Sequence, residues 1–336
     1  MKVAITCNIL PSNYLRESGD DTFAEFDSPD TVNEIKNSLL NHPQCGQVEI
    51  VEANQDAYQK LRQGNFDFVF NIAEGLKGEA REAQIPAMLE MLDIPHTGSG
   101  VTTLAITLDK RRTKESLYAS GIRTPGYQLL HSWNEYKSRL DYPLFVKPNN
   151  EGSSRGITAK SLATCREELE NAVSEIVEAY RQPALVEEYL PGKEFTVGLV
   201  GNSPQVLPIV EVSFDHLPSD APKFDCYEVK WIYDSLEANC ETTFCPAKID
   251  KDLENRIYEA AVETFRALDI KDLCRIDLRL DENGQPSIID VNALPGLIPD
   301  PAENSRFPKA AYAGGYTYQG LIWAIFDSAL ERVGML

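Results

Sequence analysis

Hydrophobic positions in the first hundred residues follow two periods in alternation. Short apolar runs at residues 3–6, 48–51 and 66–72 have the length of buried strands. Apolar residues at helical spacing predict helices over residues 31–40 and 83–92. Strands that alternate with helices in this way predict a small parallel sheet with helices on its faces.

The rest of the chain carries longer blocks of the same two patterns. The patterns predict helices over residues 109–120, 165–180, 252–268 and 318–333. They predict strands over residues 126–130, 144–147, 184–189, 194–200, 274–280 and 287–291. We divide the chain into three α/β domains, at residues 1–104, 105–185 and 186–336.

Charge and hydropathy exclude several classes of partner. Among 336 residues, 52 are Asp or Glu and 32 are Lys or Arg, which gives a net charge of -20. A nucleic-acid partner is not expected, because a surface that neutralises phosphates needs clustered Lys and Arg. No stretch approaches the roughly 20 apolar residues of a membrane helix, and the first residues read as a strand, not a signal sequence. We therefore expect a cytoplasmic protein with no membrane partner.

Cysteine and histidine usage argues against two further kinds of site. The seven cysteines lack CxxC spacing and nearby histidine pairs, which favours reduced thiols over a zinc site or a disulfide framework. The four histidines lie near no Ser or Cys in a recognisable nucleophile motif, so hydrolysis by a catalytic triad has little support.

Two predicted strands near the C-terminus carry polar side chains at alternating positions. Arg275 and Asp277 share one face of the first strand, and Asp290 and Asn292 share one face of the second. The turn sequence at residues 281–284 joins the strands as a hairpin. Two carboxylates and an amide oxygen would then converge, which suits Mg²⁺ with positions left open for phosphate oxygens. The alternative is a solvent-facing hairpin with ordinary charges.

Two earlier segments carry groups suited to a nucleotide. Lys147 ends a predicted strand, and the Gly/Ser loop at residues 152–156 can bring backbone N–H groups around phosphates. The loop lacks the Gly-Lys-Ser/Thr element of a Walker A motif, and a plain turn is the alternative. Acidic residues at 187, 188 and 194 could hold an adenine amine and ribose hydroxyls, although an exposed acidic strand end would have the same sequence.

Together and in this order, these segments resemble the ATP-grasp superfamily, and within it the D-alanine–D-alanine ligase family. The likeness runs from about Phe68 to the C-terminus. It includes Phe-Asn-Ile-Ala-Glu-Gly at 70–75, Ile-Pro-His-Thr-Gly-Ser-Gly-Val at 94–101 and Leu-Asp-Lys at 108–110. The resemblance implies an ATP-grasp fold of three α/β lobes: an N-terminal Rossmann-like pre-ATP-grasp domain, a central ATP-binding lobe and a C-terminal mixed-sheet lobe.

The resemblance also implies roles for individual positions. The implied ATP site consists of Lys110, Lys147, Ser153, Ser154, Glu187, Glu188, Tyr189, Leu190, Glu194 and Lys230. The implied ligands of Mg²⁺, with two ions expected and Mn²⁺ as a substitute, are Asp277, Asp290 and Asn292. The implied catalytic groups are Ser153, Lys230, Arg275 and the backbone of Gly296.

Departures from the family pattern cluster in the substrate sites. Glu74 stands where the family has His before Gly, and Trp231 replaces the lid tyrosine. In the metal site, the family's Glu ligand is Asp at position 290. The loop at residues 297–306 is longer than in the family. Near the N-terminus, we expect an acidic residue before Ser28, Glu25 or Asp27, to bind the amino group of a substrate. The candidate substrate residues are Glu25, Asp27, Glu74, Trp231, Arg275, Gly296, Ser305 and Arg306.

These expectations combine into one reaction. We expect an ATP- and Mg²⁺-dependent ligase that activates a carboxylate as an acyl phosphate and joins it to an amine, with an amino acid as one substrate. The departures favour biosynthesis of a small peptide or a specialised metabolite, such as a mycosporine-like amino acid, and the resemblance implies a homodimer. The alternatives are cell-wall D-alanine–D-alanine ligase, a non-catalytic nucleotide-binding regulator and a small-molecule kinase.

Overall fold

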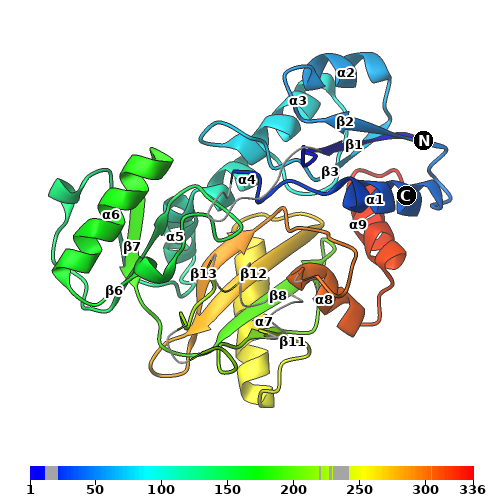
Figure 1. Ribbon diagram of the computed structural model, residues 1–336. Helices are drawn as coiled ribbons and strands as arrows, with labels where there is room; N and C mark the ends of the chain where they lie inside the picture. The colour runs from blue at the N-terminus through cyan, green and yellow to red at the C-terminus, as the bar shows by residue number, and fades with distance from the viewer. Residues whose placement is uncertain (12–21, 219–220, 227–228, 230–241, 304) are drawn as a thin grey trace.

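The chain folds into three α/β lobes that surround a central region (Figure 1). This computed structural model describes residues 1–11, 22–218, 221–226, 229, 242–303 and 305–336. In Figure 1 the first lobe lies at the upper right, the second at the left and the third below them. Among the helices of the described residues, none has the length and apolar character needed to cross a membrane.

The first lobe is built on a three-stranded parallel sheet with the order β2-β1-β3. Its strands are β1 (Lys2–Cys7), β2 (Gln47–Glu52) and β3 (Phe68–Asn71). Its helices are α1 (Pro29–Leu40), α2 (Ala57–Gly64), η1 (Arg81–Ala83) and α3 (Gln84–Leu92). Ser28 caps α1 by accepting the Thr31 N–H. The parallel sheet predicted for this region is confirmed.

The second lobe contains a four-stranded antiparallel sheet with the order β4-β7-β5-β6. Its strands are β4 (Tyr127–Leu130), β5 (Leu144–Pro148), β6 (Leu162–Ala163) and β7 (Ala184–Glu188). The helices of this region are α4 (Val101–Leu108), α5 (Lys110–Ala119), η2 (Trp133–Glu135), η3 (Ala159–Ser161) and α6 (Arg166–Tyr180). One face of α6 packs on the sheet, where Leu169 and Val173 join a core with Val146 and Val186.

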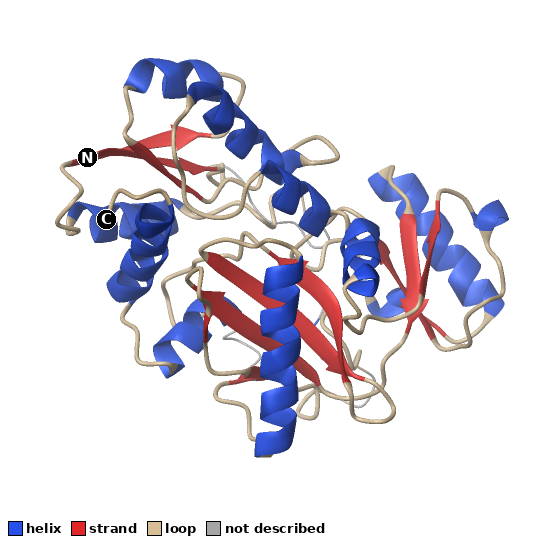
Figure 2. Ribbon diagram, turned by 180° about the vertical axis from the view of Figure 1, so that it is seen from behind, coloured by secondary structure: helices blue, strands red, loops and turns tan. Residues whose placement is uncertain are grey.

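The third lobe contains a six-stranded sheet with the order β11-β10-β8-β12-β13, and β9 pairs with β8. Its strands are β8 (Glu194–Val200), β9 (Gln205–Val206), β10 (Val210–Val212), β11 (Thr243–Phe244), β12 (Leu273–Leu280) and β13 (Pro286–Asn292). Its helices are α7 (Lys251–Ala267), α8 (Arg306–Ala313) and α9 (Tyr318–Arg332). The view from behind shows α7 lying across the sheet (Figure 2), so its other face is left to the site.

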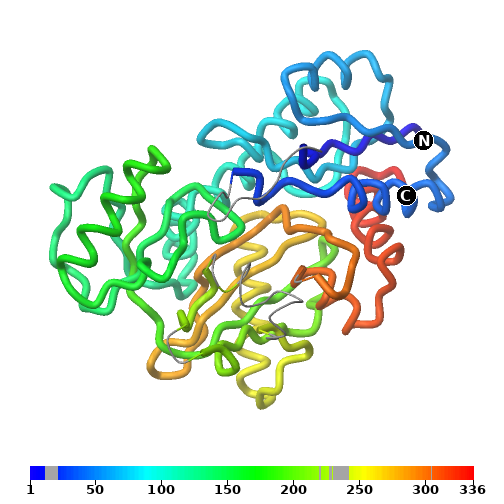
Figure 3. The backbone as a smooth tube through the Cα atoms, viewed as in Figure 1, coloured from blue at the N-terminus to red at the C-terminus, as the bar shows by residue number. Residues whose placement is uncertain are grey.

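The last helix packs on the first lobe, beside α1, and it also contacts β8 of the third sheet (Figure 3). The ring centroids of Phe326 and Phe68 are 5.3 Å apart in an edge-to-face contact. Trp323 Nε1 donates to the Ser38 carbonyl at 2.7 Å. One buried cluster therefore contains residues of β1, α1, α9 and β8 together.

Two features of the structure concern the expectations from the sequence: the limits of the domains and the helix α4. The expected domain limits at 104/105 and 185/186 fall inside α4 and β7. The helix α4 was not predicted, because Val101–Leu108 is rich in β-branched residues, which have weaker helix propensity. Tertiary packing overrides that propensity, since Thr103, Leu104 and Thr107 are buried.

Candidate active site

The predicted C-terminal hairpin is present and arranges polar side chains in facing pairs. Strands β12 and β13 are antiparallel, and their register places Asp277 opposite Asp290. The same register places Arg275 opposite Asn292. Directly opposite residues have Cβ atoms about 4.5 to 5.5 Å apart. Two carboxylates and an amide oxygen therefore lie close together, and these hard oxygen donors could hold Mg²⁺.

Asp277 is oriented by residues of two strands. Thr196 on β8 donates its hydroxyl to Asp277 Oδ1 at 2.6 Å. Arg275 donates from Nε and Nη2 to Asp277 Oδ2 at 3.3 and 3.0 Å. Both carboxylate oxygens are thus fixed, and the guanidinium of Arg275 is held beside them.

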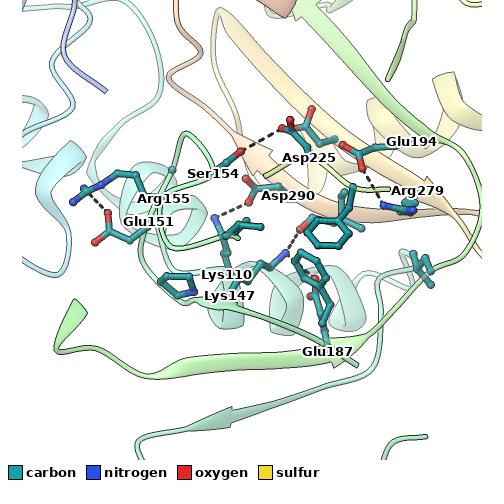
Figure 4. A pocket seen from close by; sticks show the side chains of 18 of the residues that line it. Lys110, Lys147, Glu151, Ser154, Arg155, Glu187, Glu194, Asp225, Arg279 and Asp290 are labelled. Carbon is teal, nitrogen blue, oxygen red and sulfur yellow. Dashed lines mark hydrogen bonds and ion pairs between the residues drawn. The ribbon is translucent and has the colours of Figure 1, made fainter. Parts of the chain in front are cut away.

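Lys110 reaches the hairpin from the start of α5. Asp109 caps this helix by accepting the Arg112 N–H, and it also accepts from the Asn149 side-chain amide at 2.8 Å. Lys110 Nζ lies 2.9 Å from Asp290 Oδ1, and Figure 4 shows the two side chains pointing toward each other. Burial would raise the pKa of Asp290, but Lys110 and Lys147 outweigh burial and hold that pKa below its ordinary value.

Glu187 on β7 is shared by two buried lysines. Its Oε1 lies 2.8 Å from Lys147 Nζ on β5, and its Oε2 lies 2.9 Å from Lys114 Nζ on α5. Burial lowers the pKa of Lys114 to about 8 despite the opposing charge of Glu187. For Lys147, burial acts in the same direction, but Glu187 and Asp290 leave the pKa above its ordinary value. Lys114 was missed by the sequence reading, although it follows Lys110 by four residues and so shares its helix face.

The Gly/Ser loop has an unusual backbone. Ser153, Ser154 and Gly156 have φ angles of 49°, 60° and 71°, in the left-handed region. A Cβ at Gly152 would lie 2.3 Å from Glu25 Oε1, so this position has no room for a side chain. Backbone in this region can form anion-binding concavities, and the loop lines the pocket in front of Lys147.

A second set of charged side chains, Glu194 and Arg279, lines the same pocket. Arg279 Nη1 donates to Glu194 Oε2 at 3.3 Å, and Arg279 Nη2 donates to the Tyr189 hydroxyl at 2.8 Å. The guanidinium also lies 4.7 Å from the centre of the Tyr189 ring. Burial raises the pKa of Glu194 to about 7, against the effect of Arg279. Glu188 and Leu190 line the pocket as well.

A second pocket adjoins the first one. It is lined by the candidate substrate residues Glu25, Asp27, Glu74, Arg275, Gly296, Ser305 and Arg306, and also by Asn292. Lys110, Ser153, Arg275 and Asp290 line both pockets. The other two candidates, Lys230 and Trp231, lie outside the described residues.

Two residues of this second region were missed by the sequence reading. Arg81 Nη2 donates to both carboxylate oxygens of Glu25, at 3.0 and 2.7 Å, and Arg81 Nη1 donates to the Asn150 carbonyl at 2.7 Å. Glu82 is buried at the pocket wall. The one sign of these two residues in the sequence is that they form a charged pair directly before the apolar helix at residues 84–92.

Comparisons with known proteins agree with this geometry. Residues 121–327 match the family model described as D-ala D-ala ligase C-terminus. The uncharacterized protein y4sG of Sinorhizobium fredii is 39% identical, over 99% of this chain and 98% of that protein. The D-alanine–D-alanine ligase of Alcanivorax borkumensis is 34% identical, over 85% of this chain and 84% of that enzyme. That of Pelotomaculum thermopropionicum is 31% identical, over 85% of this chain and 87% of that enzyme.

Solved structures support the fold. The crystal structure of Bacillus anthracis D-alanine–D-alanine ligase complexed with ATP aligns with a TM-score of 0.73 and 22% identity, over 99% of this chain and 98% of that chain. The predicted ATP-grasp fold is thereby confirmed. The family match covers more than half of the sequence, and both ligases above are more than 30% identical to it. The chain therefore belongs to the D-alanine–D-alanine ligase family of ATP-grasp enzymes, which form carbon–nitrogen bonds.

Proposed function

We propose that the two adjoining pockets carry out an ATP- and Mg²⁺-dependent ligation through an acyl phosphate, with an amino acid as a substrate. The observation that carries this proposal is the shared wall formed by Lys110, Ser153, Arg275 and Asp290. A phosphate in the first pocket and a carboxylate in the second would meet at these groups. Phosphoryl transfer depends chiefly on such positioning and on neutralising charge.

The first pocket suits a nucleoside triphosphate. Glu187 Oε2 lies 2.9 Å from Lys114 Nζ, and a carboxylate oxygen with one such partner can also accept a hydrogen bond from an adenine amine. Glu194 can accept hydrogen bonds from ribose hydroxyls. Lys110, Lys147 and the N–H groups of the Gly/Ser loop would contact the phosphates. Lys230 has the same proposed role.

The candidate metal ligands complete the phosphate site. Asp277, Asp290 and Asn292 would hold Mg²⁺, or Mn²⁺ as a substitute, and two ions are proposed. When bound, the metal supplies neutralisation of charge on phosphate oxygens. The ion pair between Lys110 and Asp290 shows that this carboxylate already has a cationic partner. Nucleotide phosphates can draw Lys110 away from it.

The proposed reaction has two steps. A substrate carboxylate oxygen attacks the terminal phosphorus of ATP, and the bond to the bridging oxygen of ADP breaks. An amine nitrogen then attacks the acyl carbon, phosphate leaves, and the nitrogen loses a proton. Arg275 and the Gly296 N–H would stabilise the oxyanion. Ser153 and Ser154 would help to exclude water from the labile acyl phosphate.

Arg306 is suited to hold a carboxylate of the amine substrate. It lies at the first position of α8, is 5% exposed and lines the second pocket. Its Nη2 lies 2.9 Å from Asp225 Oδ1, yet Nε and Nη2 have no hydrogen-bond partner among the described residues. Ser305 donates to the Gly296 carbonyl at 3.3 Å. Two buried, unsatisfied donors beside this serine favour capture of a carboxylate.

The amino group of the other substrate would face Asp27 and Glu74. Glu25 remains a candidate, but both of its oxygens accept from Arg81. Trp231 is proposed as a lid residue. Glu74 and Arg306 favour substrates other than D-alanine, in biosynthesis of a small peptide or a specialised metabolite such as a mycosporine-like amino acid. A homodimer remains a prediction, which light scattering of the purified protein would test.

A phosphate-release assay with ATP, Mg²⁺ and an amino-acid panel tests the proposal. Asp277→Asn and Asn292→Ala should each reduce amine-dependent phosphate release by about 100-fold or more. Undiminished nucleotide turnover in both variants would overturn the ligase site. Efficient D-alanyl-D-alanine formation at low substrate would instead favour the cell-wall enzyme. ATP binding without turnover would favour a regulator, and a phosphorylated product formed without an amine would favour a kinase.

A further inference from the structure

Three carboxyl groups of the second pocket lack a cationic partner. Asp27, Glu74 and Glu82 come from separate segments of the first lobe and line one side of the pocket; we refer to them as the acidic wall. Within the described chain, no ion pair or hydrogen bond joins any of these three side chains to another residue. The acidic wall therefore presents three carboxyl groups without an ion-pair partner to whatever occupies the pocket.

Neighbouring carboxylates of the same pocket are compensated within the protein. Glu25 Oε2 lies 2.7 Å from Arg81 Nη2, and Glu151 Oε2 lies 2.6 Å from Arg155 Nη1. Asp290 is paired with Lys110 on the opposite side. The two arginines thus form ion pairs with other acids, which leaves the acidic wall free to pair with a cationic ligand.

Glu82 is the member of the acidic wall that is hardest to explain as a structural residue. It is 8% exposed and lies in η1, before the buried start of α3. Burying a carboxylate without a partner costs stability. Burial and the nearby charge of Glu25 raise the pKa of Glu82 to about 8, and burial also raises the pKa of Asp27 to about 7. Both groups would be ionised more readily if a cation lay beside them.

We propose that the substrate activated in this pocket is a basic amino acid, which places its α-ammonium group and a cationic side chain against Asp27, Glu74 and Glu82. This inference rests on the proposed function, since the carboxylate of the same substrate lies at Lys110 and Arg275. One ammonium group compensates one carboxylate, and a neutral amino acid would leave the rest of the acidic wall unpaired. A second cation, as in lysine, ornithine or arginine, matches the charge better.

Matched amino acids test the inference in the full-length protein. Lysine is compared with norleucine, ornithine with norvaline, and arginine with citrulline, each in both stereoisomers, because each pair differs mainly in the side-chain charge. The readouts are ATP-dependent phosphate release with a common amine and calorimetric binding in the presence of Mg²⁺ and ADP. The basic member of a pair should be preferred by about tenfold or more, which is the size of a charge-assisted hydrogen bond.

Two variants test which side chain causes the preference for a basic amino acid. Glu82→Gln keeps the side-chain shape and should reduce the preference for lysine over norleucine by about tenfold. Glu79→Gln is the matched control, because Glu79 is exposed in the same segment and does not line the pocket. It should leave the preference unchanged.

The outcomes separate this inference from the proposed function. If neutral amino acids support phosphate release as well as basic ones, the ligase stands and the basic-substrate inference falls. If no amino acid supports phosphate release, the proposed function falls, and calorimetry still decides the inference. Equal binding of lysine and norleucine would overturn it, whereas tighter binding of lysine that Glu82→Gln abolishes would support it.

Discussion

At the scale of single residues, the proposed nucleotide pocket depends on buried charges that hold one another. Glu187 has Lys147 on one oxygen and Lys114 on the other, and all three side chains are almost fully enclosed. Removing one partner of a buried ion pair leaves uncompensated charge, which is usually more harmful than the pair is beneficial. Lys114 therefore holds Glu187 in place, although Lys114 itself does not line the first pocket.

Lys114→Met should lower both stability and nucleotide affinity. The free energy of unfolding should fall by about 3 kcal/mol, because Thr124 and Glu187 lose a buried cation. The KM for ATP should rise several-fold, since Glu187 is then held from one side. Arg112→Met on the same helix is the control, because Arg112 is exposed and pairs only at the surface with Glu115. Equal melting temperatures for the two variants would contradict this role.

Glu82 predicts a pH dependence of stability. The folded protein binds the Glu82 proton up to about pH 8, whereas an ordinary glutamate releases it near 4.5. Between those values the unfolded state has lost a proton that the folded state keeps. The free energy of unfolding should therefore fall as pH rises, by about 1.4 kcal/mol per pH unit from this group.

Melting curves of the empty protein across this range measure the effect. The apparent melting temperature should fall more steeply with pH in the native protein than in Glu82→Gln, by about 2 °C per pH unit. Glu79→Gln should keep the native slope. Parallel curves for all three proteins would show that Glu82 ionises normally in the folded state.

At the scale of elements, the hairpin β12–β13 could be predicted from the sequence, but the contacts that orient its side chains could not. Alternating polar residues and the turn at 281–284 predict that Asp277 and Asp290 converge, and a register shift between Asp277 and Leu278 places them directly opposite each other. The same pattern gives no sign of Thr196, which donates to Asp277 from a position 81 residues earlier in the chain. Contacts of this kind depend on the order of strands in the sheet, which local periodicity does not encode.

The positions of Arg81, Glu82 and Lys114 could not be predicted for the same reason. Each is a charged residue at a buried place, and burial there arises only when two lobes meet. Sequence patterns indicate which face of an element is apolar, so they assign charged residues to solvent. The resemblance to a known family added the positions that match its motifs. It did not add these three residues, which lie outside the motifs that carry the resemblance.

Thr196→Val should weaken the metal site more than it weakens the fold. Valine keeps the shape but removes the hydroxyl that donates to Asp277, and loss of such a supporting contact typically costs about tenfold or more in metal affinity. The Mg²⁺ concentration for half-maximal phosphate release should rise accordingly. Thr264→Val is a matched control, since Thr264 is equally buried but its hydroxyl has no partner among the described residues. An unchanged Mg²⁺ requirement in Thr196→Val would remove Thr196 from the site.

At the scale of the whole molecule, α9 connects the two ends of the chain. Phe326 packs on Phe68 of the first lobe, and His42 Nε2 lies 3.0 Å from Asp327 Oδ1. At its other end, Arg332 Nη2 lies 2.8 Å from the buried Asp272, which also accepts the Gly98 N–H. The helix therefore fixes the first lobe, which carries the acidic wall, against the third lobe, which carries the proposed metal ligands.

Phe326→Ala should loosen this connection. A buried phenylalanine replaced by alanine typically costs about 3 to 5 kcal/mol, so the melting temperature should fall and proteolysis of the first lobe should become faster. Leu336→Ala is the control, because Leu336 is 56% exposed near the same helix. The KM for the carboxylate substrate should rise more than that for ATP, because the proposed ATP site lies between the other two lobes. A larger rise in the KM for ATP than in the KM for the carboxylate substrate would contradict this account.

The position of α9 also has a consequence during synthesis. Its residues emerge from the ribosome after every other described element, yet they cover the side of the first lobe that holds Phe68 and Ile35. The first lobe therefore keeps an apolar surface open until α9 has been translated. Nascent chains of this protein should need shielding by chaperones over that whole interval.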